Sequence, residues 1–279
     1  MKLSLAIQTP EVEPLVPVAL LNGTFEEKLP KAARLGADGV ELMSANPALL
    51  DAGTIRASLQ EHGLEAAAIG SGAVAFATGL TLLHADPEKA GRAKAVMHAL
   101  VDLAAAVSAP LVTGAPLVTV GSFRGRLASV GTGGRERLVA VLRAAATYAA
   151  SRGVRLVLEP LNRYESDVIN DVKDGLAFLR DVGHPALGLV LDTYHVNIEE
   201  SSWTTPFRQA MAAGRLWHVH IGDNNRLPPG RGLIDFPAIV ATLREIGYDG
   251  YLSAELLARP DPDTAARDTL TYMRSLLEA

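Results

Sequence analysis

Short apolar runs alternate with longer amphipathic segments along this chain. An apolar run of about five residues bounded by turn residues is typical of a buried strand, whereas apolar residues spaced three and four apart are typical of a helix. The expected strands are 3–7, 39–43, 66–69, 115–119, 154–158, 188–192, 216–221 and 251–254. The expected helices are 24–35, 51–62, 86–107, 136–151, 172–182, 206–213, 236–246 and 264–277. Eight strand and helix pairs without an internal linker predict an α/β protein, a (β/α)8 barrel that forms one domain over residues 1–279.

Two points of this interpretation stay open. The sequence Ala-Pro-Leu-Val-Thr occurs at 109–113 and again at 115–119, and we prefer the second copy as the fourth strand because a loop rich in Gly and Arg, 121–126, follows it. The alternative architecture is an open doubly wound sheet, but no Gly-x-Gly-x-x-Gly follows the first strand. The glycine cluster 131–134 precedes a helix without a Lys-Ser/Thr ending, so we do not expect a phosphate loop.

Composition and charge restrict the function classes. The chain has 279 residues, a formal net charge of −5 and a pI near 5.8, so no overall positive field favours nucleic acid or an anionic membrane. It has no cysteine, which excludes disulfides and thiolate-bound zinc. No leader pattern opens the sequence, and no run approaches the roughly 20 apolar residues of a membrane span. We expect a cytoplasmic protein that acts on small molecules.

Acids and one histidine stand at the carboxyl ends of the last four expected strands. They are Glu159, Asp192, His220 and Glu255. In a barrel these ends meet on one face, which carries the active site, so we expect the four side chains to converge. Three carboxylates and one imidazole suit a divalent metal, and the oxygen-rich set favours Mn²⁺, Mg²⁺ or Co²⁺ over structural zinc, with catalytic zinc still open.

Other polar residues are placed to serve the same face. His218 and His220 lie two apart in a strand and point to the same side, so we expect His220 to be the ligand and His218 to pack one layer deeper. His195 lies in the expected loop after Asp192, where we favour a role in substrate binding. Arg226 lies in a loop stiffened by Pro and Gly at 228–232, and its guanidinium suits polyol or carboxylate binding.

Arg124 and Arg126, in the loop after the fourth strand, are ambiguous. If one of them reaches the pocket, it would pair with the carboxylate of a sugar acid; otherwise both are solvated or contact another subunit. A homo-oligomer is compatible with the sequence, and Trp203 with its surrounding loop would suit an interface.

Five stretches in the second half of the chain resemble the ketose 3-epimerases, the D-tagatose and D-psicose 3-epimerase relatives among the xylose-isomerase-like barrels. These stretches are 158–165, 191–200, 218–226, 229–232 and 247–255. The first half, with residues 1–5, 68–72 and the 124–126 loop, is more similar to the branch that contains 5-keto-L-gluconate epimerase. The repeated Ala-Pro-Leu-Val-Thr and the glycine cluster depart from the family pattern, which leaves the choice of substrate open.

The resemblance implies a role for each site residue. It implies that Glu159, Asp192, His220 and Glu255 hold one metal ion, commonly Mn²⁺. It further implies that Glu159 and Glu255 are the two proton-transfer bases. The residues implied to contact substrate are Glu165, His195 and Arg226.

The expected activity is therefore a metal-dependent epimerase that inverts the carbon next to the ketone of a ketose or keto-sugar acid, by two-base proton transfer through a metal-stabilised enediolate. The alternative is an aldose–ketose or hydroxypyruvate-type isomerase with the same metal site. An endonuclease-type barrel would need more ligands in the first half, where Glu41 is the only strand-end acid, and a basic face. A non-catalytic sugar-binding module would not need the full set of ligands.

Overall fold

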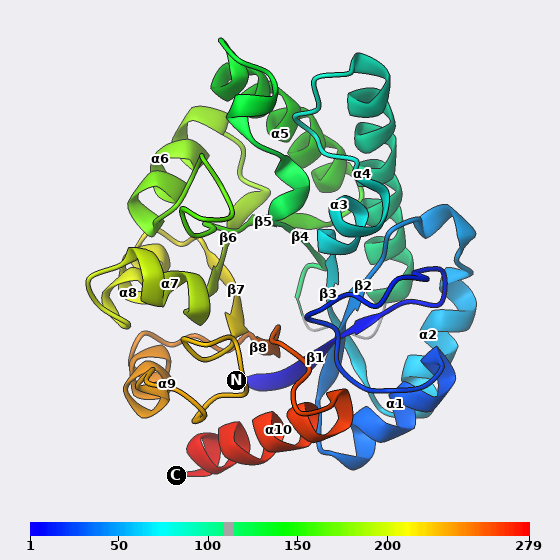
Figure 1. Ribbon diagram of the computed structural model, residues 1–279, viewed down its shortest axis with the longest axis vertical. Helices are drawn as coiled ribbons and strands as arrows, with labels where there is room; N and C mark the ends of the chain where they lie inside the picture. Colours follow the sequence, from blue (N-terminus) through cyan, green and yellow to red (C-terminus); the bar gives the residue numbers. More distant parts are fainter. Residues whose placement is uncertain (109–113) are drawn as a thin grey trace.

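The computed structural model describes residues 1–108 and 114–279. Within them, eight parallel strands close into a barrel, in which each strand pairs with its neighbours in the chain and β8 pairs with β1. The strands are β1 (Lys2–Gln8), β2 (Gly39–Met43), β3 (Glu65–Gly70), β4 (Leu117–Val120), β5 (Arg155–Leu158), β6 (Leu187–Asp192), β7 (Leu216–Ile221) and β8 (Tyr251–Ala254). Figure 1 shows the strands as an inner ring surrounded by helices. The predicted (β/α)8 barrel is confirmed.

The longer helices form the outer ring. They are α1 (Phe25–Arg34), α2 (Ala52–Glu61), α4 (Pro87–Ser108), α5 (Gly134–Ser151), α6 (Val172–Val182), α8 (Thr205–Ala212), α9 (Phe236–Glu245) and α10 (Pro262–Glu278). All eight match predicted helices because their ends carry local signals. Thr24 and Glu27, for example, form a capping box at the start of α1, and Asp51 accepts the backbone N–H of Thr54 at 2.8 Å at the start of α2.

Several short helices in the loops were not predicted. They are α3 (Gly72–Thr78), α7 (Thr193–Glu199) and the 3₁₀ turns η1 (Pro47–Leu49), η2 (Ser122–Arg124) and η3 (Leu127–Ser129). Each has at most two turns, which is too short for a helical spacing of apolar residues to be recognised. The preferred second copy of Ala-Pro-Leu-Val-Thr does supply β4, whereas the first copy, 109–113, lies outside the described residues.

The strands are buried on both faces, but the inward-facing side chains are not all apolar. Val219 alternates with His218 and His220, so it faces the surrounding helices and belongs to the apolar core, whereas Glu41 of β2 reaches the two histidines of β7 across the inside of the barrel. The register of the sheet aligns Asp192 with His220. The carboxyl ends of the strands therefore lie at one level, which gathers their polar side chains on one face of the barrel.

No helix in residues 1–108 and 114–279 is long and apolar enough to cross a membrane.

Candidate active site

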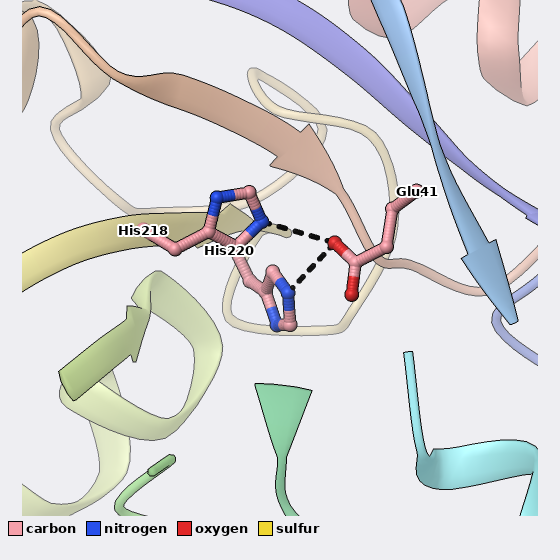
Figure 2. Close-up of side chains that lie close together, drawn as sticks. All are labelled: Glu41, His218 and His220. Atoms are coloured by element: carbon pink, nitrogen blue, oxygen red, sulfur yellow. Dashed lines mark hydrogen bonds and ion pairs between the residues drawn. The ribbon is translucent and has the colours of Figure 1, made fainter. Parts of the chain in front are cut away.

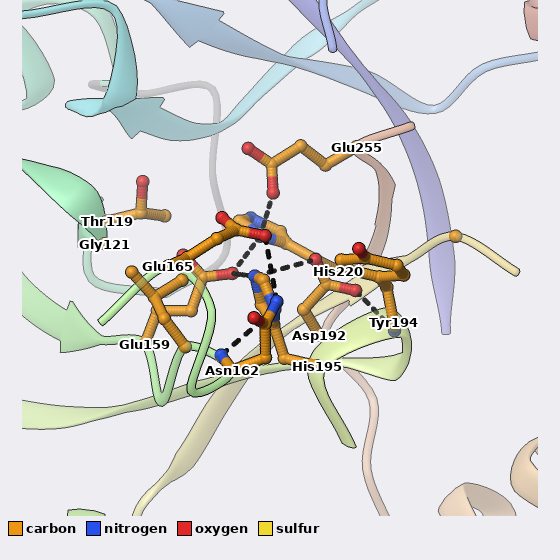
Figure 3. A network of polar contacts seen from close by, with 12 residues as sticks. Thr119, Gly121, Glu159, Asn162, Glu165, Asp192, Tyr194, His195, His220 and Glu255 are labelled. Atoms are coloured by element: carbon orange, nitrogen blue, oxygen red, sulfur yellow. Dashed lines mark hydrogen bonds and ion pairs between the residues drawn. The ribbon is translucent and has the colours of Figure 1, made fainter. Parts of the chain in front are cut away.

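The four strand-end residues expected to bind metal lie together. Glu159 follows β5, Asp192 ends β6, His220 lies in β7 and Glu255 follows β8. One ligand atom from each lies within 4.8 Å of every other. Nδ1 of His220 is 3.3 Å from Oε1 of Glu159 and 3.0 Å from Oε2 of Glu255, as Figure 3 shows. We call these four residues the strand-end cluster.

Glu159 is fixed through its backbone. Its N–H donates to the carbonyl of Val120 at 3.1 Å, which extends the pairing of β4 and β5 by one residue before Pro160 ends it. Its carboxylate lies over Gly121, where a Cβ would collide with Oε2 of Glu159. A glycine at this position therefore makes room for the carboxylate.

Asp192 divides its two carboxylate oxygens between the fold and the cluster. Oδ1 accepts the backbone N–H of Tyr194 at 2.8 Å and so caps α7. Oδ2 is buried without a hydrogen-bond partner, 3.6 Å from Nη2 of Arg226. One carboxylate oxygen is thus left free to bind a cation.

His195 lies on α7 and is buried, not in a loop as the sequence suggested. Its Nδ1 accepts the backbone N–H of Asn162 at 3.3 Å and lies 2.8 Å from the side-chain nitrogen of the same residue. Burial and the nearby Arg226 lower the pKa of His195 well below its usual value, so the ring is neutral. A neutral ring that accepts at Nδ1 carries its hydrogen on Nε2, which has no hydrogen-bond partner and lines the pocket. His195 is therefore a hydrogen-bond donor toward the pocket.

Arg226 is held by the loop between β7 and α9. Its backbone is left-handed, with φ of 57°, and its N–H donates to the carbonyl of Asp223 at 2.7 Å. Asp223 is fully buried, and its carboxylate accepts four backbone N–H groups. These belong to Asn224, Gly230, Gly232 and Ile234. The guanidinium lies 3.3 Å from Oε2 of Glu255 and stacks on Tyr194 at 4.7 Å. The rigid loop predicted from the Pro-Pro-Gly-Arg-Gly sequence therefore presents this cation to the cluster.

Glu165 lies at the rim of the same site. Its Oε1 accepts the side-chain N–H of Asn162 at 2.9 Å and is 3.8 Å from Nη1 of Arg226. Its side chain is 44% exposed, so it is accessible to a ligand entering the pocket. Asn162, which the sequence analysis did not single out, thus connects Glu165 to His195.

The strand-end cluster has an unfavourable balance of charge. Burial raises the pKa of Asp192 and of Glu159, and the neighbouring charge of Glu255 raises that of Glu159 further. Burial alone would lower the pKa of Arg226, but the charges of Asp192 and Glu255 outweigh it and raise that pKa. Burial also tends to raise the pKa of Glu255, but His220 and Arg226 outweigh it and lower that pKa. Two buried carboxylates and a partly buried third thus surround one arginine and one histidine, and a divalent cation would balance the remaining negative charge.

The residues fit a divalent cation. The free Oδ2 of Asp192, the paired glutamates and the imidazole nitrogen form a ligand set of three oxygens and one nitrogen, which suits hard or borderline divalent metals. The site therefore agrees with the metal centre expected from the sequence.

Glu159, His220 and Glu255 of the cluster line the floor of a pocket of about 280 Å³. Val16, Pro17 and Val18 line it from the loop after β1, and Phe76 lines it from α3. The pocket thus has a charged floor and an apolar wall, a size and chemistry suited to a small polar molecule with an apolar edge.

Comparison with known proteins gives the family. Residues 29–276 match the family described as the xylose isomerase-like TIM barrel. The chain belongs to this family. It is similar to the L-ribulose 3-epimerase of Methylomonas sp. (strain DH-1), with 33% identity over 88% of this chain and 82% of that protein.

Two further relatives extend the comparison. The 3-dehydro-D-guloside 4-epimerase of Escherichia coli (strain K12) is 38% identical over 51% of this chain and 54% of its own. The crystal structure of D-psicose 3-epimerase with D-tagatose from Clostridium cellulolyticum H10 covers all of both chains at 27% identity, with a TM-score of 0.76. These relatives match the ketose 3-epimerase family to which the sequence motifs pointed.

A second set of buried polar side chains, Glu41, His218 and His220, lies next to the strand-end cluster. Oε2 of Glu41 is 3.0 Å from Nε2 of His218 and 3.0 Å from Nε2 of His220, as Figure 2 shows. His218 lies one layer deeper, as predicted. Burial tends to raise the pKa of Glu41, but the two histidines outweigh it and hold that pKa well below its usual range. The sequence analysis noted Glu41 only as an isolated strand-end acid and missed this contact.

Arg124 and Arg126 do not line the pocket, so a carboxylate-binding role for either is not supported. Arg124 is fully buried and donates to the carbonyls of Gly121, Glu159, Val168 and Ile169 and to the hydroxyl of Ser166. Arg126 is more exposed and donates to the carbonyls of Tyr164 and Glu165 at 3.1 and 2.8 Å. Both arginines hold the loop that carries Glu165.

We expect Arg124→Met to lower the free energy of unfolding by about 3 kcal/mol, because several buried carbonyls lose their donor at once. Arg126→Met should cost less than about 1 kcal/mol, since its contacts are near solvent. Urea denaturation of both variants measures the two values. Equal losses would show that burial of Arg124 does not hold the loop.

Proposed function

We propose that this protein is a divalent-metal-dependent epimerase that inverts the carbon next to the ketone of a ketose, the C3 position. The observation that carries the proposal is that Oε1 of Glu159 and Oε2 of Glu255 lie 3.3 and 3.0 Å from Nδ1 of His220, at the floor of the pocket. Two carboxylates from different strands at one small site suit proton removal on one face of a carbon and proton return on the other. The 3-epimerase relatives support the position of the reaction.

Glu159, Asp192, His220 and Glu255 would hold the cation, for which we propose Mn²⁺, with Mg²⁺ or Co²⁺ as alternatives. When bound, the cation would supply Lewis-acid stabilisation of the negative charge that develops beside the carbon that loses its proton.

The protein groups divide the remaining work. In the proposed reaction one of Glu159 and Glu255 removes the proton from C3 and the other returns one to the opposite face, which inverts the centre. Nε2 of His195 and the guanidinium of Arg226 donate hydrogen bonds to substrate oxygens, and Glu165 accepts one from a hydroxyl group. An aldose–ketose isomerase would move the proton between C1 and C2 instead, and product analysis separates the two.

We further propose that the substrate is a neutral ketose and not a keto-sugar acid. Arg226 is the only Lys or Arg among the described residues that line the pocket, and three carboxylates of the site already surround it. A substrate carboxylate would therefore meet the charge of Glu159, Glu165 and Glu255 without a free Lys or Arg to pair with. Three expectations stay predictions from the sequence: that residues 1–279 act as one catalytic domain, that the protein is cytoplasmic, and that it forms a homo-oligomer.

We expect Glu159→Gln and Glu255→Gln each to lower the rate of epimerisation by about 10³-fold or more, because a general base contributes on this scale. Each variant keeps one base, so each should still exchange the C3 hydrogen of one epimer with deuterium from solvent without forming the other epimer. The two variants should exchange opposite epimers. NMR of each pure epimer in D₂O follows exchange and product together, and efficient epimerisation by either variant contradicts the assignment of two bases.

We expect D-psicose, D-tagatose or L-ribulose to be turned over with a kcat/KM at least 10-fold above that of 5-keto-L-gluconate, because the pocket has no unpaired cation for the carboxylate. Turnover of all four compounds under one condition gives the comparison. A higher value for the keto acid would defeat the neutral-ketose proposal while leaving the epimerase proposal intact.

We expect a chelator to lower the thermal stability of the cation-loaded protein. A cation whose free concentration is 100 times its Kd adds about 2.7 kcal/mol to the free energy of unfolding. Thermal unfolding with Mn²⁺ and with excess chelator measures the difference. Asp192→Asn is the matched variant, since it weakens a proposed ligand, and it should show a much smaller difference. The same shift in both proteins would place the cation elsewhere.

A further inference from the structure

Glu41 is a buried carboxylate outside the proposed metal ligands, yet it contacts one of them. It comes from β2, on the far side of the barrel from β7, and Figure 2 shows it facing His218 and His220. A single oxygen, Oε2, lies 3.0 Å from Nε2 of both rings, which is a normal length for an N–H···O hydrogen bond.

The contacts fix where the hydrogens lie. An ionised carboxylate oxygen only accepts hydrogen bonds, so both imidazoles must carry a hydrogen on Nε2. A neutral His220 with its hydrogen on Nε2 has a lone pair on Nδ1, and Nδ1 is the atom that faces Glu159 and Glu255. Glu41 thus selects the form of His220 that can bind a cation in the strand-end cluster.

The carboxylate is itself held on both sides. His218 is fully buried and contacts the same oxygen from the deeper layer, with its ring nearly perpendicular to that of His220. The hydroxyl of Thr119 lies 3.3 Å from the other oxygen, Oε1. These contacts leave Glu41 little freedom to turn away from His220.

We propose that Glu41 is a positioning residue that orients His220 and sets its tautomer for cation binding, and that His218 holds Glu41 in place. The inference rests on the proposed metal site. Ligand histidines that donate their second ring N–H to a carboxylate bind metal more tightly, and loss of that carboxylate typically costs 10- to 100-fold in affinity.

The rival explanation is a second cation bound by Glu41, His218 and His220, whose ligand atoms also lie within 4.8 Å of one another. It would require the ring of His220 to bind one cation at each nitrogen and would remove both Nε2 hydrogens. The two explanations therefore differ in the number of cations per chain and in the presence of these hydrogens.

The first part of the test uses the unaltered protein. We expect a titration with Mn²⁺, monitored through the EPR signal of the unbound ion, to give one bound ion per chain. Proton NMR of the Mg²⁺-loaded protein should show two far-downfield imidazole N–H resonances that exchange slowly with solvent, from His218 and His220. Two ions per chain, or no such resonances, would overturn the proposal without the need for any variant.

The second part compares Glu41→Gln with Glu65→Gln. Glu65 is a matched control at the opposite end of the barrel interior, where its carboxylate contacts Lys2 and Tyr251. We expect Glu41→Gln to weaken Mn²⁺ binding 10- to 100-fold and to shift both N–H resonances, and Glu65→Gln to do neither. Unchanged affinity in a folded Glu41→Gln protein overturns the role of Glu41 alone, whereas a wild-type protein that binds no Mn²⁺ overturns the metal site on which it rests.

Discussion

Mutual repulsion among buried carboxylates is the constraint on which the rest of this site depends. Glu159 and Asp192, which are buried, and Glu255, which is partly buried, come from three strands and meet at one imidazole, in a place where burial disfavours negative charge. Two features of the surrounding structure reduce this repulsion. A loop built around Asp223 holds Arg226 against the cluster, and one oxygen of Asp192 accepts a backbone N–H as a helix cap. The remaining charge explains why the cluster calls for a divalent cation.

The barrel could be predicted from the sequence because every strand and every long helix carries its own local signal. Apolar runs mark the strands, and caps such as Thr24 and Asp51 mark the helix starts. Helix α7 could not be predicted, since it starts directly after the last residue of β6 and has only seven residues. The sequence therefore predicts a loop after Asp192, whereas His195 lies on the first turn of this helix. His195 lines the pocket all the same, because a loop and a short helix at this point both place it just beyond the end of a strand.

Convergence of the strand-end cluster was predictable since barrel geometry brings successive strand ends together regardless of their separation in sequence. The contact of Glu41 with His220 was not, because it joins β2 to β7 across the interior, and no local pattern encodes which inward-facing residues meet. The role of Arg124 could not be predicted for a different reason. The sequence left open whether this arginine reached the pocket, was solvated or contacted another subunit, whereas it is fully buried and donates to backbone carbonyls that only the folded loop brings together.

The charged floor and the apolar wall of the pocket come from different parts of this barrel. The residues proposed for proton transfer and cation binding lie at the ends of β5 to β8, where the sequence stretches that resemble the 3-epimerases also lie. The apolar wall of the pocket comes from the loop after β1 and from α3, and Phe76 in this wall is 51% exposed. Loops vary more readily than strands because few buried contacts depend on them. The residues proposed for the reaction can therefore be recognised in the second half of the chain, whereas the apolar side chains of the first half that line the pocket follow no charge pattern.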